Sequence, residues 1–231
     1  MTEAGGSPSL PYVVLHVAVS LDGRTQGFAP NIGAFYGLVR HWQEDATLVG
    51  SRTVLDSPEG GNLDDPSSPA AWSESARSER PLLAVVDSGG LVRCWGALGA
   101  AGLWKSAVSL GSKRTKPDHL EYLNTQGVQS LIEGEDRVAL RPALEQLHQD
   151  YGIRVIRVDS GGELNGILLN EGLVSEVSLL VHPVLVGGAE TSCWWGTTEG
   201  PETNRTTSLA LAGHEQVSNE LLWVRYHVKP A

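Results

Sequence analysis

Short apolar segments that alternate with helical patterns are the feature of this sequence that most constrains its fold. The segments are rich in β-branched residues, and several end at Gly, Asp or Ser, which is typical of buried strands. The segments expected to form strands are residues 12–19, 46–50, 82–86, 106–110, 128–132, 153–158, 174–181, 208–212 and 221–228.

The spacing of apolar side chains between these segments predicts amphipathic helices. Phe35, Leu38, Val39 and Trp42 fall at positions i, i+3, i+4 and i+7, on one helical face, and Asn31 is a suitable N-cap for them. A second stripe has a proline in its first turn and a glycine just past its end; it comprises Leu140, Leu144, Leu147 and Tyr151 with Pro142 and Gly152. Shorter helices are expected near 118–124 and over 164–171, the latter closed by Gly172.

Strands separated by helices predict an α/β fold with helices on both faces of the sheet. The last two strands have no helix between them, so we expect a C-terminal antiparallel hairpin at the edge of a mixed, mainly parallel sheet. With 231 residues and 41% hydrophobic content, residues 11–231 are expected to form one large domain. Residues 1–10 are expected to be a flexible tail, and residues 57–80, rich in Ser, Pro, Asp and Gly, a long loop.

Charge and cysteine content argue against several classes of protein. The formal net charge is −10, which disfavours binding to nucleic-acid phosphates. Cys94 and Cys193 are far apart, and no histidine pair has metal-ligand spacing, so we expect reduced thiols and no metal site. The N-terminus lacks a secretory pattern and no apolar stretch is long enough to cross a bilayer, so a cytoplasmic protein without membrane contact is expected.

A glycine-rich turn at residues 159–165 is the first candidate binding motif. It follows a predicted strand and opens a predicted helix, where free N–H groups and the helix dipole favour an anion such as a pyrophosphate. It is not a G-x-G-x-x-G fingerprint, Glu163 adds a negative charge, and an ordinary glycine-rich turn is the competing interpretation.

Two further strand ends carry polar side chains. Ser20, Asp22 and Arg24 surround a tight turn, and could bind sugar hydroxyls or phosphate or form only a solvated turn. The segment 50–56 begins with Gly-Ser-Arg-Thr, and could meet a ligand or simply cap a helix.

Taken together and in this order, the motifs resemble the reductase domain of riboflavin biosynthesis, within the dihydrofolate reductase superfamily. Four stretches carry the resemblance: residues 11–24, 48–56, 84–88 and 152–188. The last contains Ser-Gly-Gly-Glu-Leu-Asn, Glu-Gly-Leu-Val-Ser-Glu-Val and His-Pro-Val-Leu-Val-Gly-Gly, and is the most specific. The resemblance implies a dihydrofolate-reductase-like sheet, NADPH as cofactor, a homodimer, and reduction of the ribose of a ribosylaminopyrimidine phosphate to a ribityl chain.

The resemblance also implies roles for individual residues. Arg24 and Asp159 are the expected catalytic pair nearest the reacting sugar, with His16, Ser20 and Asp22 on the substrate side. The expected cofactor contacts are Gly50, Thr53, Asp56, Ser88, Gly161, Gly162, Glu163 and Leu164. Arg52 and Arg93 are candidates for a 2′-phosphate contact by position only, so NADPH and NADH both stay open.

Some positions depart from the family pattern. Arg24 stands where the family favours Lys, Asp159 where it favours Glu, and His16 where Asn is usual. The segment 25–33 is short and lacks the basic residues that help to hold the substrate phosphate. Two alternatives therefore remain: a reductase of the same fold acting on another pterin-like or secondary-metabolite substrate, and a cofactor-binding dimer without catalysis.

Overall fold

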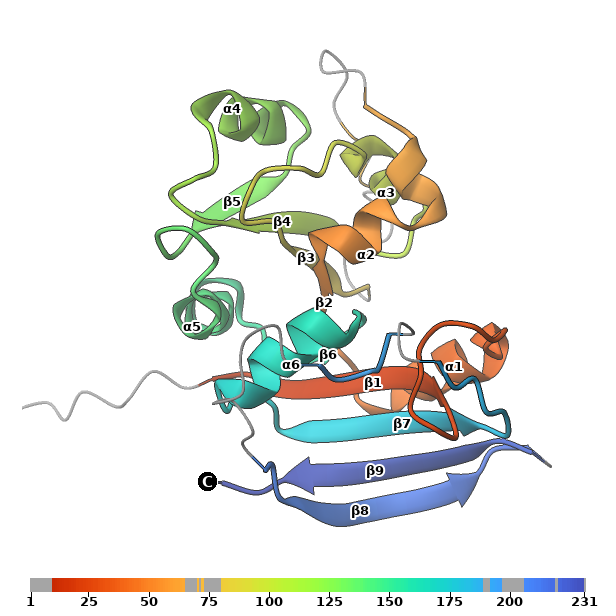
Figure 1. Cartoon of the computed structure of the whole chain (residues 1–231). Helices are drawn as coiled ribbons and strands as arrows, with labels where there is room; N and C mark the ends of the chain where they lie inside the picture. The colour runs from red at the N-terminus through yellow and green to blue at the C-terminus, as the bar shows by residue number, and fades with distance from the viewer. Residues whose placement is uncertain are drawn as a thin grey trace, which may run out of the picture.

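A single nine-stranded sheet organises the chain (Figure 1). The computed structural model describes residues 10–64, 70, 72, 80–188, 192–196, 206–218 and 220–230. The strands are β1 (Tyr12–Ser20), β2 (Ala46–Gly50), β3 (Leu82–Val86), β4 (Ser106–Gly111), β5 (Gln129–Ile132), β6 (Val155–Val158), β7 (Glu176–His182), β8 (Leu209–Gln216) and β9 (Leu222–Val228). Their order in the sheet is β5-β4-β3-β2-β6-β1-β7-β9-β8.

The strand directions confirm the predicted mixed sheet. Every neighbouring pair from β5 across to β7 is parallel. Strand β9 is antiparallel to β7, and β8 is antiparallel to β9, so the C-terminal hairpin forms one edge of the sheet. The predicted tail and most of the predicted loop at 57–80 lie outside the described residues.

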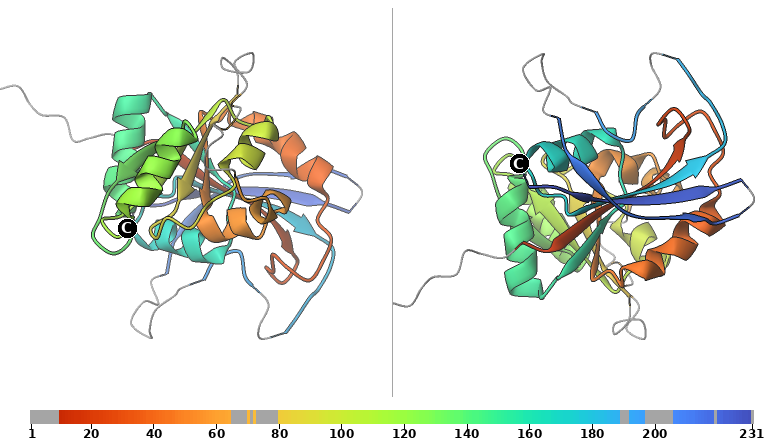
Figure 2. Two further views of the ribbon diagram at one scale, coloured as in Figure 1. Left: turned by 90° about the horizontal axis from the view of Figure 1, so that it is seen from above. Right: turned by 90° about the horizontal axis from the view of Figure 1, so that it is seen from below.

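Helices cover both faces of the sheet (Figure 2). They are α1 (Ile32–Leu38), α2 (Ser51–Leu55), α3 (Trp95–Ala100), α4 (Pro117–Thr125), α5 (Leu140–Tyr151) and α6 (Gly162–Asn170), with 3-10 turns η1 (Val39–His41) and η2 (Pro58–Gly61). Leu144 of α5 and Leu168 of α6 join one buried cluster, whereas Phe35 of α1 and Trp95 of α3 belong to clusters on the other face.

Local signals explain where two helices begin and end. The Asn31 side chain accepts a hydrogen bond from the N–H of Ala34 at 2.9 Å and caps α1 as expected. Helix α1 ends earlier than the apolar stripe suggests, because its last turn tightens into η1. Gly152 ends α5 with φ of 67°, a left-handed conformation that glycine adopts without strain.

One helix was not predicted. Helix α3 is six residues long, and its Trp95 is fully buried against the β2–β4 side of the sheet. Its Trp-Gly-Ala-Leu-Gly-Ala sequence contains two glycines and has no N-cap hydrogen bond, so tertiary burial rather than helix propensity holds it in place.

The parallel strands have one consequence for function. Their carboxyl ends all meet at the same edge of the sheet, where ligands bind in open α/β sheets. This edge receives Ser20 from β1, Gly50 from β2, the segment after Val86 from β3, and Asp159 just after β6.

Candidate active site

The turn between β6 and α6 joins two of the predicted motifs. The Ser160 hydroxyl accepts a hydrogen bond from the N–H of Gly50 at 3.3 Å and lies 3.1 Å from the Thr53 hydroxyl. The N–H of Asp159 donates to the Leu48 carbonyl at 2.9 Å. These contacts fix the ends of β2 and β6 together. Ser160 had no predicted role.

The two glycines of this turn face different surroundings. Among the described residues, and apart from the chain neighbours of Gly161, no atom lies within 4 Å of the position that a Cβ on that glycine would take. A Cβ on Gly162 would lie 2.3 Å from the carbonyl oxygen of Cys193. Gly161 therefore offers an open approach to a ligand, whereas the bare Cα of Gly162 accommodates the protein's own 192–196 segment.

The first turn of α6 suits an anion. The N–H groups of Gly162, Glu163 and Leu164 have no acceptor within the helix, because they occupy its first turn. The side chain of Leu164 is buried in the core, so only its backbone could face a ligand. The chain's donor set at this place, two hydroxyls and helix-start N–H groups, matches what a pyrophosphate needs.

Two charges border the turn. Arg52 Nη1 lies 3.7 Å from Glu163 Oε2, and the two side chains are 83% and 50% exposed. The negative charge of Glu163 is thus partly balanced by a cation that stays free to reorient. Asp56, at the C-cap of α2, is exposed near this end of the sheet.

Ser88 lies after β3 at the same edge. Its hydroxyl accepts a hydrogen bond from the N–H of Val138 at 3.0 Å, and its carbonyl accepts one from the Ser112 hydroxyl at 2.9 Å.

Arg93, the other candidate for a 2′-phosphate contact, stacks on the Tyr122 ring at 4.3 Å. Of the two arginines, Arg52 is therefore the better placed beside the β6–α6 turn.

The turn after β1 uses most of its polar groups internally. The Ser20 hydroxyl donates to Asp22 at 2.7 Å and accepts the N–H of Arg24 at 2.9 Å. The Asp22 carboxylate also accepts the N–H groups of Gly187 and Val186, at 2.8 and 3.1 Å. The Ser20 hydroxyl and these two N–H groups hold the pKa of Asp22 well below its usual range, so Asp22 is an ionised anchor for the turn.

The Arg24 guanidinium bridges this turn to the 192–196 segment. Its Nε lies 3.7 Å from Asp22 Oδ2 and its Nη1 lies 3.5 Å from the Cys193 sulfur. Arg24 and Cys193 also form an isolated antiparallel β-bridge. The side chain is 24% exposed, so the guanidinium is held in place yet still reaches solvent.

His16 lies inside the protein rather than at the substrate side. It is 1% exposed, its two ring nitrogens lie 3.0 Å from the Ser178 hydroxyl and 3.1 Å from the Phe35 carbonyl, and its ring stacks on Phe35. Burial lowers the pKa of His16 to about 4, so the ring is neutral at pH 7. The geometry does not support the prediction that His16 contacts substrate, because both nitrogens already have partners.

Asp159 belongs to a polar cluster that the sequence analysis missed. Its Oδ2 accepts hydrogen bonds from Arg157 Nη1 at 2.8 Å and from the Tyr36 hydroxyl at 3.3 Å. Arg157 in turn binds Glu44 through Nε and Nη2. No motif marks these residues, since Tyr36 lies on α1 and Glu44 precedes β2, more than 100 residues from Asp159.

The predicted catalytic pair is held by separate partners. Leu15 pairs with Val158, so His16 is level with Asp159, and β1 continues to Ser20. Each residue of a parallel strand advances the chain by about 3.3 Å. Because β1 continues for four residues past His16, the turn that carries Arg24 begins well beyond the level of Asp159 along the strand direction. Any joint action of Arg24 and Asp159 therefore requires a ligand that spans both strand ends.

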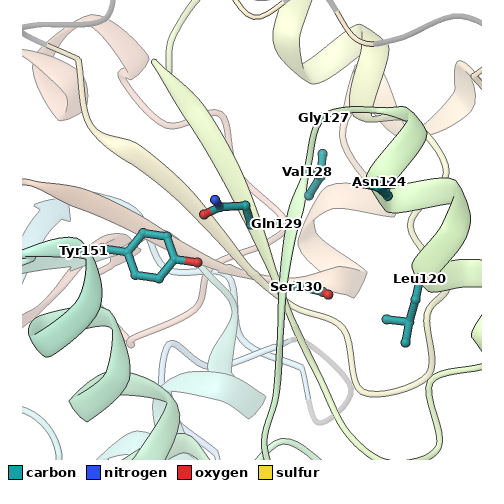
Figure 3. Close-up of a pocket in the computed structure, with 7 residues that line it drawn as sticks. All are labelled: Leu120, Asn124, Gly127, Val128, Gln129, Ser130 and Tyr151. Atoms are coloured by element: carbon teal, nitrogen blue, oxygen red, sulfur yellow. The ribbon is translucent and has the colours of Figure 1, made fainter.

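The structure also contains two cavities. One, of about 460 Å³, is at the amino end of β5 and is lined by Leu120, Asn124, Gly127, Val128, Gln129, Ser130 and Tyr151 (Figure 3). The other, of about 470 Å³, is lined by Leu169, Val177, Trp194, Trp195, Thr206, Thr207 and Leu209. Neither includes a predicted site residue, so the strand-edge geometry, and not a cavity, defines the candidate site.

The described parts of the chain show neither a metal-binding cluster nor a membrane helix. No group of three or more His, Cys, Asp or Glu side chains among them could hold a metal ion. Across the same described residues, no helix has the length and apolar character to cross a bilayer. The two cysteines are unpaired thiols; Cys94 is buried and Cys193 is half-buried.

Comparison with known proteins places this geometry in a family. The sequence profile described as RibD C-terminal domain matches residues 11–223. The 2,5-diamino-6-ribosylamino-4(3H)-pyrimidinone 5′-phosphate reductase of Methanothermobacter thermautotrophicus is 30% identical over 186 residues, covering 78% of this chain and 81% of the relative. The reductase of the same name from Archaeoglobus fulgidus is 30% identical over 195 residues, covering 78% and 84%.

Solved structures share the fold. A Corynebacterium diphtheriae pyrimidine reductase-like protein has a TM-score of 0.71 at 16% identity, with 96% of this chain and 93% of that chain covered. Acinetobacter baumannii RibD has a TM-score of 0.70 at 22% identity, covering 95% of this chain but only 58% of that longer protein. The sheet with its β6–α6 turn and the profile match along most of the chain lead to one conclusion: this protein belongs to the RibD C-terminal domain family.

Proposed function

We propose that this protein is an NADPH-dependent reductase that converts the ribose of a ribosylaminopyrimidine 5′-phosphate to a ribityl chain, with residues 11–231 as a single reductase domain. The observation that carries the proposal is the joined end of β2 and β6, where the Ser160 hydroxyl contacts Gly50 and Thr53 immediately before Gly161. The names of the two archaeal relatives support this substrate class.

The cofactor would be held by groups of the β6–α6 turn. The N–H groups at the start of α6 and the hydroxyls of Thr53 and Ser160 would bind its pyrophosphate, and the exposed Arg52 would meet a 2′-phosphate. When bound, NADPH supplies the hydride for the reduction. The Ser88 segment at the end of β3 would border the adenosine side.

The chain's own contribution to the rate is positioning. Arg24, held by Asp22 and Cys193, and Asp159, held by Arg157 and Tyr36, would orient the open-chain sugar from two strand ends. Fixing two reactants in an attack geometry can supply much of a rate enhancement, so rigid anchors behind these side chains matter.

One observation favours a second candidate, a reductase of the same fold with a different heterocyclic substrate. Ser20 and Asp22, expected on the substrate side, are both occupied in holding the turn and the 184–187 segment. A substrate phosphate would then need ligands other than those that the family uses. Segment 25–33 contains no basic residue that could serve as one.

We further propose a cytoplasmic homodimer. Strand β8 is one of the two edges of the sheet, and its Leu209 and Leu211 are 37% and 59% exposed, a pattern that favours pairing with a second chain. The two free thiols fit a reducing compartment. Light scattering coupled to size-exclusion chromatography should give twice the 24.7 kDa chain mass.

The test of the function is an assay of NADPH oxidation with the ribosylaminopyrimidine 5′-phosphate, with mass spectrometry of the product. We expect oxidation of one NADPH per ribityl product. Tight NADPH binding without turnover of this substrate, but with turnover of another heterocycle, would favour the second candidate. Binding without turnover of any candidate would favour a non-catalytic cofactor-binding protein.

A further inference from the structure

A buried arginine occupies the middle of the sheet. Arg157 lies on β6, the central strand, between Thr47 of β2 and Val14 of β1 in the register, and is 4% exposed. Its neighbours Ile156 and Val158 turn to the opposite face and join the α5–α6 core. An apolar side chain at position 157 would be buried at a lower desolvation cost, so a charged residue there indicates a specific role.

All three nitrogens of this guanidinium donate hydrogen bonds. Nε donates to Glu44 Oε2 at 2.5 Å and Nη2 to Glu44 Oε1 at 3.2 Å, a two-pronged pairing that fixes the guanidinium plane. Nη1 donates to Asp159 Oδ2 at 2.8 Å. The Thr47 hydroxyl donates to Glu44 at 3.2 Å, so the anchor itself is held.

The two ends of this chain of contacts differ in exposure. The side chains of Arg157 and Glu44 are 5% and 8% exposed, whereas that of Asp159 is 29% exposed at the carboxyl edge of the sheet. Burial alone would lower the pKa of Arg157, but the carboxylates of Asp159 and Glu44 raise it above its ordinary value, so Arg157 remains a cation. A permanent, immobile charge thus lies directly behind a partly exposed carboxylate.

The contacts also leave one oxygen of Asp159 for another partner. Arg157 and Tyr36 both donate to Oδ2, and burial raises the pKa of Tyr36 to about 12, so its hydroxyl stays a donor. Within the part of the chain that the structure describes, no hydrogen bond uses Oδ1 of Asp159. Two donors therefore hold the carboxylate by one oxygen and leave the other available to a ligand.

We propose that Arg157 is a positioning residue of this reductase: anchored by Glu44, it fixes the Asp159 carboxylate so that Oδ1 faces the reacting sugar. The inference rests on the proposed function, in which Asp159 contacts the substrate. Arg157 itself touches no substrate and acts through Asp159.

A double-mutant cycle tests this role. The set is Arg157→Met, Asp159→Asn, the double variant and Arg157→Lys, with Arg225→Met as the control. Arg225 forms a partly buried ion pair with Glu176, at 3.6 Å, and lies on β9, three strands away from β6 in the sheet. Each variant is assayed for kcat, for KM of the pyrimidine substrate, for Kd of NADPH and for Tm.

We expect Arg157→Met to lower kcat about 10- to 100-fold while the Kd for NADPH changes less than about twofold. In the Asp159→Asn background the same change should alter kcat less than about twofold, because the group that Arg157 positions is already lost. Arg157→Lys should recover part of kcat, and Arg225→Met should keep kcat whatever it does to Tm. Equal losses of kcat from Arg157→Met in both backgrounds, or no loss in either, would overturn the proposal.

A readout without turnover keeps the test independent of the proposed function. Crystal structures of the wild type and Arg157→Met should show the Asp159 carboxylate rotated away from its wild-type position in the variant. An unmoved carboxylate would refute the positioning role. Failure of the wild type to reduce the pyrimidine substrate would instead count against the proposed function and leave this structural comparison to decide the role of Arg157.

Discussion

The carbonyl oxygen of Cys193 lies against the bare Cα of Gly162, at the position where any side chain would begin. A Cβ on Gly162 would be 2.3 Å from that oxygen, and the N–H of Gly196 donates to the Gly162 carbonyl at 3.2 Å. Asn165 adds a hydrogen bond to the Trp194 carbonyl at 2.8 Å. These contacts hold the 192–196 segment against the start of α6. Of the two glycines, Gly161 is the one whose Cβ position has open space in the part of the chain that the structure describes.

This difference predicts separate effects for the two glycines. Gly162→Ala should lower the free energy of unfolding by about 1–3 kcal/mol, because the backbone of Cys193 must move. Gly161→Ala should cost less than about 1 kcal/mol of stability. It should nevertheless raise the Kd for NADPH about tenfold, because a methyl group would stand where the pyrophosphate approaches. Denaturant unfolding and fluorescence titration measure both quantities; unchanged NADPH affinity in Gly161→Ala would contradict the cofactor site.

His16 should make stability depend on pH. The folded pKa of His16, lowered by burial to about 4, lies below the unfolded value, so between the two values the unfolded chain binds a proton that the folded chain does not. Stability from this residue is complete above about pH 6.5 and falls as the pH decreases towards 4. His16→Asn should reduce the loss of unfolding free energy between pH 7 and pH 5 by about 2 kcal/mol. An identical loss in wild type and variant would contradict this account.

Arg24 should affect reaction more than folding. Removal of the guanidinium in Arg24→Ala should lower kcat/KM about 10- to 100-fold, the range for a lost hydrogen bond to a charged group. Arg24→Lys should retain more activity, because it keeps a cation at the place where the family has one. Steady-state kinetics and Tm of both variants check this. Wild-type kcat/KM in Arg24→Ala would remove Arg24 from the site.

Arg52 and Glu163 should set cofactor preference. Arg52→Ala should raise the Kd for NADPH about 2- to 10-fold and leave NADH binding unchanged, whereas Glu163→Gln should tighten NADPH binding. Both effects should shrink in high salt, since both side chains are exposed. Titrations with the two cofactors at low and high ionic strength measure the difference. Equal changes for NADPH and NADH would show that Arg52 does not meet the 2′-phosphate.

The fold was largely predictable because each strand carries its own signal. The apolar runs and helical stripes are local, so the β1, β2 and β3 segments and the Gly152 helix end follow directly from them. Helix α3 was not predicted, because its stability comes from the burial of Trp95, which no local sequence pattern encodes. The split of the first helix into α1 and η1 likewise depends on packing rather than on apolar spacing.

The candidate site was less predictable, because its main contacts join distant segments. Resemblance placed Asp159 and Gly161 at one edge, but Tyr36, Glu44 and Arg157 have no motif and meet only through the sheet register. An arginine inside an apolar strand was the one available signal for the cluster, since a buried charge requires partners. The burial of His16 could not be predicted, because the sequence does not show whether a histidine on a strand faces the core or the site.

The most direct measurement of the central claim is NADPH oxidation, followed at 340 nm, on addition of the ribosylaminopyrimidine 5′-phosphate, with the product identified by mass. The account predicts stoichiometric formation of the ribityl compound by the wild type and a large loss of kcat in Asp159→Asn. Absence of product under conditions where NADPH is bound, or wild-type turnover in Asp159→Asn, would contradict it.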